Sequence, residues 1–342
     1  MLAVLEPVVG AQGAEKGLLE RILRCLAGHP PAEEAEHDVS VLEVEALERR
    51  DRGHCFHHPR KRHPHRICES CAMRVTVVGH VEWVEFARVE ALPRPGGIVH
   101  TFETWSQAGG GGAVAALQLA RLGADASLFT AIGDDDLGRR AHAELAAAGV
   151  RVQATVRSEP QRRAFCHVDE HGERTITVLG PKQRPLGDDG ELPWEELDGT
   201  DAVYFVSGDT KALGHARRAR ILVATSRELE TLGASDVRLD ALVGSGEDDG
   251  ERYQPGDLEP PPELVVSTAG ALGGWAQPGG PYQAAPPPGP VEDAYGCGDC
   301  FAAGLTYALA DGRATADALA LAARCGAAAL TGRGVFAAPV EP

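Results

Sequence analysis

Asp299 is the residue of this chain best placed to do chemistry, because it lies between a glycine-rich turn and an apolar helix pattern. Glycines let a backbone approach a ligand closely, and the first N–H groups of a helix have no partner within it. Such amides, with the helix dipole, would bind a phosphate or the charge that develops on a transferring phosphoryl group. Asp299 would then accept the proton of an attacking hydroxyl. The plain alternative is an N-terminal cap beside a tight turn. The amides concerned are those of Gly296, Cys297 and Gly298.

Two further glycine-containing segments accompany this turn. A run of four glycines over 109–112 leads into a helix pattern, and a strand pattern over 264–267 leads into a turn that contains Thr268, Gly270 and Gly273. The first would bring bare backbone to a ligand, and the second suits contacts with nucleotide phosphates. Each alone is equally well explained as a flexible loop or a tight turn. Their order along the chain, together with the Asp299 segment, is what carries information.

The elements around these segments alternate between strands and helices from residue 74 onward. Buried strands are predicted at 75–79, 126–132, 202–206, 221–224, 241–243 and 264–267, and helices at 113–122, 137–148, 300–310 and 315–330. This alternation predicts a mostly parallel sheet covered on both faces. A strand at 98–105 and a hairpin over 163–179 predict a small β lid attached to that sheet.

In this order, the three segments resemble the PfkB family of carbohydrate and nucleoside kinases, over about residues 73–336. The glycine run, with 119–123 and 133–135, resembles the family's N-terminal signature. Residues 293–301 resemble its C-terminal signature, D-T-x-G-A-G-D-x-F. The resemblance implies a ribokinase-like three-layer α/β sandwich, with a mostly parallel central sheet and a small β lid over the sugar site. It implies an ATP-dependent phosphotransferase that acts on a hydroxyl of a sugar or related small molecule, with Mg²⁺ accompanying ATP.

The resemblance also implies residue roles and a homodimer formed through the lid. Asp299 becomes the general base, and the amides of 296–298 become the anion hole. The nucleotide-binding residues that it implies are Thr268, Gly270, Gly273 and Cys325, and the substrate-binding residues are Glu82, Glu85, Gly110, Gly111 and Gly112.

Several positions depart from the family pattern. Val114 stands where many members carry a sugar-binding Asn, and the acidic residue expected soon after the first strand is offset, so that Glu82 or Glu85 takes its place. The N-x-x-E element linked to metal and phosphate is not recognisable. Glu247 or Asp248 could supply the metal ligand, or both could belong to a solvated acidic loop. These departures leave a second function open, a kinase-like ligand-binding or regulatory protein with weak turnover.

Composition excludes several classes of partner. The 342 residues carry a formal charge of -17, from 50 acidic and 33 basic side chains, whereas a nucleic-acid partner would need a basic face. No apolar run reaches the roughly 20 residues that span a bilayer. Eight cysteines are too sparse for a disulfide scaffold, which fits a reducing compartment. We therefore expect a cytoplasmic protein with a small-molecule partner, and neither nucleic acid nor membrane.

Residues 1–72 differ in character from the predicted kinase domain at 73–342. Cys68-x-x-Cys71, with nearby histidines, could bind zinc and briefly matches a piece of ferric-uptake regulators; the alternative is a disordered tail. A second C-x-x-C, Cys297 and Cys300, could be redox-active at a helix start, or simply provide small residues beside the anion hole. The candidate zinc ligands are Cys55, His57, His58, His63, His65, Cys68 and Cys71.

Overall fold

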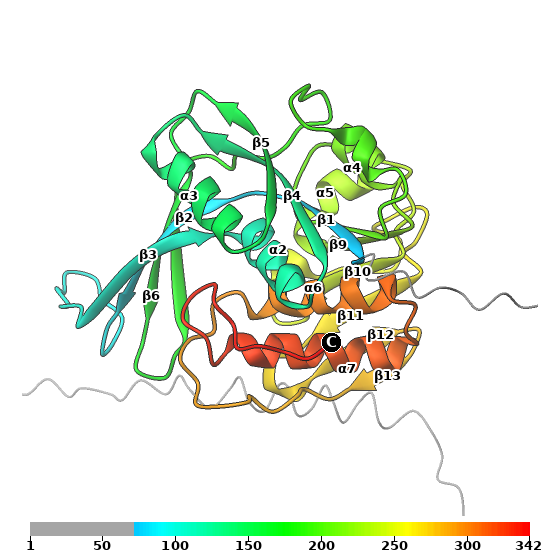
Figure 1. The fold of residues 1–342 in the computed structure, drawn as a ribbon. Coiled ribbons are helices and arrows are strands. Elements are labelled where there is room, and N and C mark those ends of the chain that lie inside the picture. The colour runs from blue at the N-terminus through cyan, green and yellow to red at the C-terminus, as the bar shows by residue number, and fades with distance from the viewer. Residues whose placement is uncertain (1–71) are drawn as a thin grey trace, which may run out of the picture. The chain divides into compact units, whose positions relative to one another are not determined.

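The computed structural model describes residues 72–342 (Figure 1). The expectations for the N-terminal extension, zinc binding included, lie outside the described residues. The strands of the larger sheet are β1 (Arg74–Val78), β4 (Asp125–Gly133), β5 (Arg151–Arg157), β8 (Ala202–Phe205), β9 (Ile221–Thr225), β10 (Ala241–Ser245), β11 (Leu264–Thr268), β12 (Gly274–Gln277) and β13 (Gly280–Tyr282).

This sheet has nine strands in the order β13-β12-β11-β10-β9-β8-β1-β4-β5. Neighbouring strands from β11 to β5 are parallel, whereas β12 and β13 are antiparallel additions at one edge. The central strands are short runs of β-branched and apolar residues that are buried on both faces, as parallel strands covered by helices require. The predicted mostly parallel sheet is thus confirmed.

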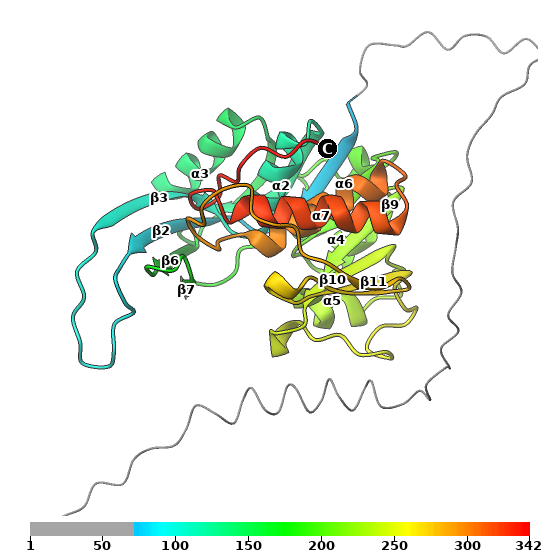
Figure 2. The same ribbon diagram turned by 90° about the horizontal axis from the view of Figure 1, so that it is seen from below.

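Helices cover both faces of the sheet. On one face α6 (Cys297–Ala310) packs against α7 (Thr315–Ala329) and α2 (Gly111–Arg121), with α3 (Asp136–Ala147) beside β4 and β5. The opposite face carries the short helices α4 (Thr210–Ala216) and α5 (Leu229–Gly233). Successive side chains of β1 divide between the two cores: Val77 belongs to the core under α2 and α6, and Val78 to the core under α4. Figure 2 shows α6 and α7 on one side of β10 and β11, with α5 on the other.

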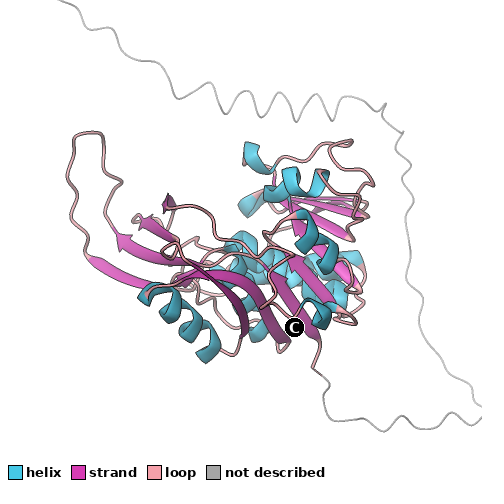
Figure 3. Ribbon diagram, turned by 90° about the horizontal axis from the view of Figure 1, so that it is seen from above, coloured by secondary structure: helices cyan, strands magenta, loops and turns pink. Residues whose placement is uncertain are grey.

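A second sheet of four strands, in the order β3-β2-β6-β7, forms the lid. It extends away from the larger sheet as a layer of its own (Figure 3). All six residues of β7 are exposed, while most of β2 is buried. The lid strands are β2 (Glu82–Arg88), β3 (Glu103–Gly109), β6 (Arg163–Val168) and β7 (Arg174–Leu179).

The lid hairpin at β6 and β7 is confirmed, but the strand predicted at 98–105 is displaced. β3 begins only at Glu103, because residues 89–102 form the connection that joins it to β2. β2 itself, β5 and the edge pair β12–β13 were not predicted. The described helices include none that is both long and apolar enough to cross a membrane.

Candidate active site

The first turn of α6 begins at a sharp bend made by Gly296. This residue has φ of 75°, a left-handed conformation that favours glycine. A Cβ atom there would lie 2.7 Å from Cγ1 of Val114 in α2, so the bend is also too close to α2 for any side chain. No side chain caps α6, and the first amides of a helix have no partner within it. The predicted anion-binding turn therefore has the required backbone.

Asp299 lies in this first turn and is partly buried. Burial raises the pKa of its carboxyl from 3.8 to about 6. The positive charges of Arg227 and Arg174 oppose this rise, and the negative charges of Glu251 and Glu82 add to it. A carboxylate with a pKa near 6 is mostly ionised at neutral pH and more basic than an exposed Asp. This is the protonation behaviour that a general base needs.

The glycine run, predicted to bind substrate, meets the Asp299 turn directly. A Cβ atom on Gly111 would lie 2.9 Å from Oδ1 of Asp299, so the carboxylate lies against bare backbone. The amide of Gly110 donates a hydrogen bond of 2.9 Å to Oη of Tyr295, just before the α6 turn. Gly112 lies against the backbone of His80, where a Cβ atom would be 2.6 Å from the carbonyl oxygen.

Asp293, the first residue of the C-terminal signature, holds the turn rather than facing a ligand. Its fully buried carboxylate accepts hydrogen bonds from the amides of Tyr295 at 2.9 Å and Gly334 at 2.7 Å. Burial raises its pKa, and those two amide bonds oppose the rise. Asp293 therefore ties the turn to the segment that follows α7.

The two candidate substrate carboxylates of β2 lie on opposite faces of that strand. Glu82 points toward the site, where Oε1 lies 2.9 Å from Nε of Arg162. Glu85 pairs instead with Arg163, at 2.5 Å between Oε1 and Nη2, and both side chains are partly exposed. Because the side chains of a strand alternate, residues three apart cannot share a face. Only Glu82 is brought to the glycine run and Asp299.

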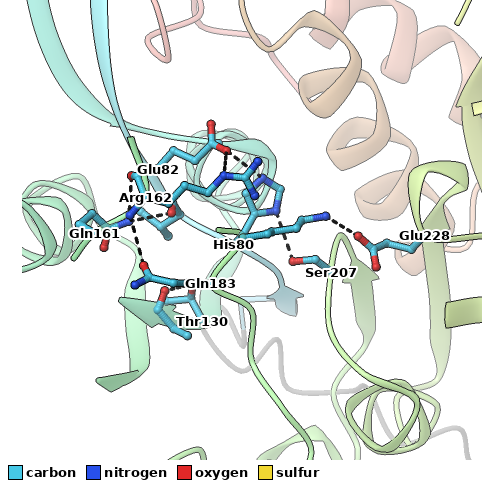
Figure 4. A network of polar contacts seen from close by, with 12 residues as sticks. His80, Glu82, Thr130, Gln161, Arg162, Gln183, Ser207 and Glu228 are labelled. Carbon is cyan, nitrogen blue, oxygen red and sulfur yellow. Dashed lines mark hydrogen bonds and ion pairs between the residues drawn. The ribbon is translucent and has the colours of Figure 1, made fainter. Parts of the chain in front are cut away.

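Four polar residues at this site were not found from the sequence: His80, Arg162, Lys182 and Glu228. Figure 4 shows the side chains of His80, Glu82 and Arg162 converging in one network. Nδ1 of His80 lies 3.3 Å from Oγ of Ser207, and Lys182 forms an ion pair with Glu228. Burial, followed by the positive charges of Lys182, Arg162 and Arg227, lowers the pKa of His80 well below its ordinary value.

The predicted nucleotide turn follows β11. Thr268 ends this strand, and its carbonyl oxygen accepts a hydrogen bond of 2.8 Å from the amide of Gly246, in the loop that follows the neighbouring strand β10. Gly270 and Gly273 have φ of 51° and 91°, as a tight turn requires. Cys325 is placed elsewhere: its thiol is buried in the α6–α7 interface, where a Cβ atom on Gly304 would lie 2.8 Å from Sγ. The structure therefore does not bring the Cys325 thiol to the turn.

The predicted metal carboxylates, Glu247 and Asp248, lie near the nucleotide turn but are not the acidic residues that act most on Asp299. Asp248 accepts a hydrogen bond of 2.9 Å from the amide of Gly250, and this bond is the main reason why its pKa is lowered. Its Oδ2 also lies 3.0 Å from Nη2 of Arg227, in an ion pair. Within residues 72–342, no group of three or more His, Cys, Asp or Glu side chains is arranged to hold a metal ion.

The sequence contains a motif that could have identified Glu228 as a candidate site residue. Thr225, the last residue of β9, and Glu228 have the spacing of the N-x-x-E element, with Thr in place of Asn. Glu228 ends the short helix η2 (Ser226–Glu228) and is only 6% exposed. Glu228 comes soon after β9, as residues 247–248 come soon after β10, and the location of the element near 244–248 stays a prediction.

Cys297 and Cys300 are unpaired in the structure. Burial raises the pKa of Cys297 to about 12, although the thiol is at a helix start, and it also raises that of Cys300. Reactive cysteines have lowered pKa values instead. The packing interpretation of this pair is the better supported one.

Comparison with known proteins decides the family. A model of the pfkB family carbohydrate kinases matches residues 72–213 and 217–341. The chain belongs to the pfkB family of carbohydrate kinases. This confirms the predicted fold and enzyme class: the protein is an ATP-dependent kinase of a sugar or nucleoside.

Individual relatives agree with this membership. An ATP-dependent ribose-1-phosphate kinase of Halopiger xanaduensis is 31% identical over 287 residues, which are 78% of this chain and 95% of that protein. Among solved structures, the ribokinase of Thermotoga maritima superposes with a TM-score of 0.61 at 20% identity, over 77% of this chain and 94% of its own. The ribokinase of Arabidopsis thaliana, complexed with ribose and ATP, gives 0.60 at 19% identity, with the same coverage of both chains.

Proposed function

We propose that this pfkB-family kinase uses Asp299 as general base and the amides of residues 296–298 as anion hole. The observation that carries the proposal is the position of the Asp299 carboxylate, at the start of α6, against the bare backbone of Gly111 and with a pKa near 6. The acceptor hydroxyl would lie between that carboxylate and the glycine run. The helix-start amides would face the transferring phosphoryl group.

The proposed step is a single displacement at phosphorus. The acceptor oxygen forms a bond to the γ-phosphorus of ATP, the bond from that phosphorus to the β–γ bridging oxygen breaks, and ADP leaves. The acceptor proton passes to the carboxylate of Asp299. Positioning and charge stabilisation supply most of the rate in such transfers, and a general base typically contributes about 10²–10⁴-fold.

Thr268, Gly270 and Gly273 are proposed to contact the nucleotide phosphates, through the turn after β11. Mg²⁺ fits the acidic residues at this end of the sheet, because it is often bound by one or two carboxylates together with substrate phosphates. Glu228 is buried here, and the side chain of Glu251, 11% exposed, accepts from the amide of Ser245 at 2.9 Å. Bound Mg²⁺ would neutralise charge on the ATP phosphates.

Dimerisation through the lid and a cytoplasmic location stay predictions. Exposed apolar side chains on and beside the lid support the first of them: Ile176, Val178 and Leu179 of β7, and Phe102 before β3. Light scattering of the full-length protein tests the dimer, and a monomer at micromolar concentration would rule it out.

The catalytic proposal is tested by ADP release from the full-length protein, with Mg²⁺, ATP and a panel of sugars, sugar phosphates and nucleosides. We expect Asp299→Asn to lower kcat by roughly 10²–10⁴-fold. Asp317→Asn is the matched control, because Asp317 occupies the first turn of α7 and is exposed. An Asp299→Asn variant within threefold of wild type would refute the general-base role. Acceptor-dependent turnover by neither protein would favour the regulatory alternative.

A further inference from the structure

The two ends of the lid hairpin bring cations to the acceptor side of the site. Arg162 immediately precedes β6, and Lys182 follows β7 by a few residues. Both ends are fixed by neutral side chains bonded to backbone: Nε2 of Gln161 donates to the carbonyl of Val81 at 2.8 Å, and Nε2 of Gln183 donates to the carbonyl of Pro160 at 3.0 Å. The base of the hairpin is therefore held by the backbone around it, independently of the two cations.

The guanidinium of Arg162 has hydrogen-bonding capacity that the described residues do not use. Its side chain is only 14% exposed, and its contact with Glu82, at 2.9 Å from Nε to Oε1, is an ion pair without hydrogen-bond alignment. Nη1 is buried and has no hydrogen-bond partner within residues 72–342. An unsatisfied buried donor on a charged group is costly. The fixed fork of a guanidinium matches the oxygens of a phosphate or carboxylate.

The ion pairs around this guanidinium would change on binding of ATP with Mg²⁺. Arg162 and Lys182 contribute two positive charges, and Glu82 and Glu228 two negative ones. Glu228, however, is also the carboxylate proposed above for Mg²⁺. His80 adds no charge here, because burial and the positive charges of Lys182, Arg162 and Arg227 lower its pKa well below its ordinary value. The ammonium of Lys182 would then be left without its carboxylate partner on the acceptor side.

We propose that Arg162 and Lys182 form a subsite for a phosphate already carried by the acceptor, so that the substrate is a sugar monophosphate and the product a sugar bisphosphate. This rests on the proposed function, because the acceptor hydroxyl must reach Asp299 while the phosphate lies under the lid hairpin. The substrate's own phosphate is only bound; the transfer remains the displacement described above. The Halopiger relative, named for ribose 1-phosphate, acts on an acceptor of this class.

Turnover by the full-length protein tests the subsite. Ribose 1-phosphate, ribose 5-phosphate and fructose 6-phosphate are each compared with the parent sugar, for wild type, Arg162→Gln and Lys182→Gln. The matched control is Arg163→Gln: Arg163 is the next residue, pairs with Glu85 on the other face of the lid, and is 43% exposed. We expect wild type to prefer a sugar phosphate. A charged hydrogen bond is worth about 1.5–3 kcal/mol, so Arg162→Gln should lower kcat/KM for that substrate by roughly 10–100-fold more than for the parent sugar.

A binding measurement without ATP keeps the two proposals separate. The preferred sugar phosphate should raise the Tm of wild type and Arg163→Gln, and should not raise that of Arg162→Gln. The subsite proposal would be overturned if wild type turned over only parent sugars. It would also be overturned if Arg162→Gln lost activity equally on the sugar phosphate and on the parent sugar. Either result would leave the kinase proposal standing. If no acceptor is turned over, the kinase proposal fails, and the Tm shifts still decide the subsite.

Discussion

Replacing Asp299 by Asn should make the protein more stable as well as inactive. The carboxyl has an ordinary pKa of 3.8 and a pKa of about 6 in the folded protein. Its penalty on folding is therefore absent below pH 3.8, grows as the pH rises toward 6, and is constant above. At about 1.4 kcal/mol per pKa unit, the difference corresponds to roughly 3 kcal/mol of lost stability at pH 7.5. Asn has nearly the same shape and no charge, so we expect Asp299→Asn to raise the free energy of unfolding by about 2–3 kcal/mol.

Urea unfolding of the full-length protein at pH 7.5, followed by tryptophan fluorescence, measures this gain. Asp317→Asn provides a control of opposite sign: Asp317 is exposed in the first turn of α7, where losing a negative charge costs about 0.3–1 kcal/mol. A variant at 299 that is less stable than wild type at pH 7.5 would refute the reasoning. It would mean that the ionised carboxylate is stabilised by its surroundings, and the raised pKa would then be wrong.

Three further outcomes follow from the same contacts. The kcat/KM of wild type should rise with pH through an apparent pKa near 6, as Asp299 loses its proton; a flat profile from pH 5 to 8 would contradict this. Gly111→Ala puts a Cβ atom 2.9 Å from Oδ1 of Asp299, so kcat should fall about 10–100-fold with little change in the urea midpoint. Asp293→Ala leaves the amides of Tyr295 and Gly334 without their acceptor, and should lower the free energy of unfolding by about 2–4 kcal/mol in the same urea assay; a loss below 1 kcal/mol would contradict it.

The catalytic turn could be found from the sequence because its signals are local. Gly296 and Asp299 are adjacent to one helix start, and Gly110 to Gly112 are adjacent to another. In a mostly parallel sheet covered by helices, such helix starts gather at one edge, which is how the two segments come to meet in the structure. The catalytic roles of these residues stay predictions.

The charged residues on the acceptor side of the site could not be found from local sequence signals. Arg162 and Lys182 flank a hairpin whose two ends meet only through strand pairing, and nothing in the residues around either one marks it. Strand β2 was missed because charged residues interrupt its apolar pattern, since one of its faces contacts the polar site. Had it been recognised, the alternation of side chains would have separated Glu82 from Glu85 at once.

Tyr295 has a consequence for how this enzyme could be re-engineered. Its hydroxyl accepts from the amide of Gly110, its ring packs edge-on against Phe86 of the lid at 5.0 Å, and its backbone immediately precedes the anion-binding turn. A lid transplanted from a relative with a different acceptor would arrive without the ring that matches it. The unit to exchange between homologues is therefore the lid together with the residue at 295, although Tyr295 lies 209 positions after Phe86 in the sequence.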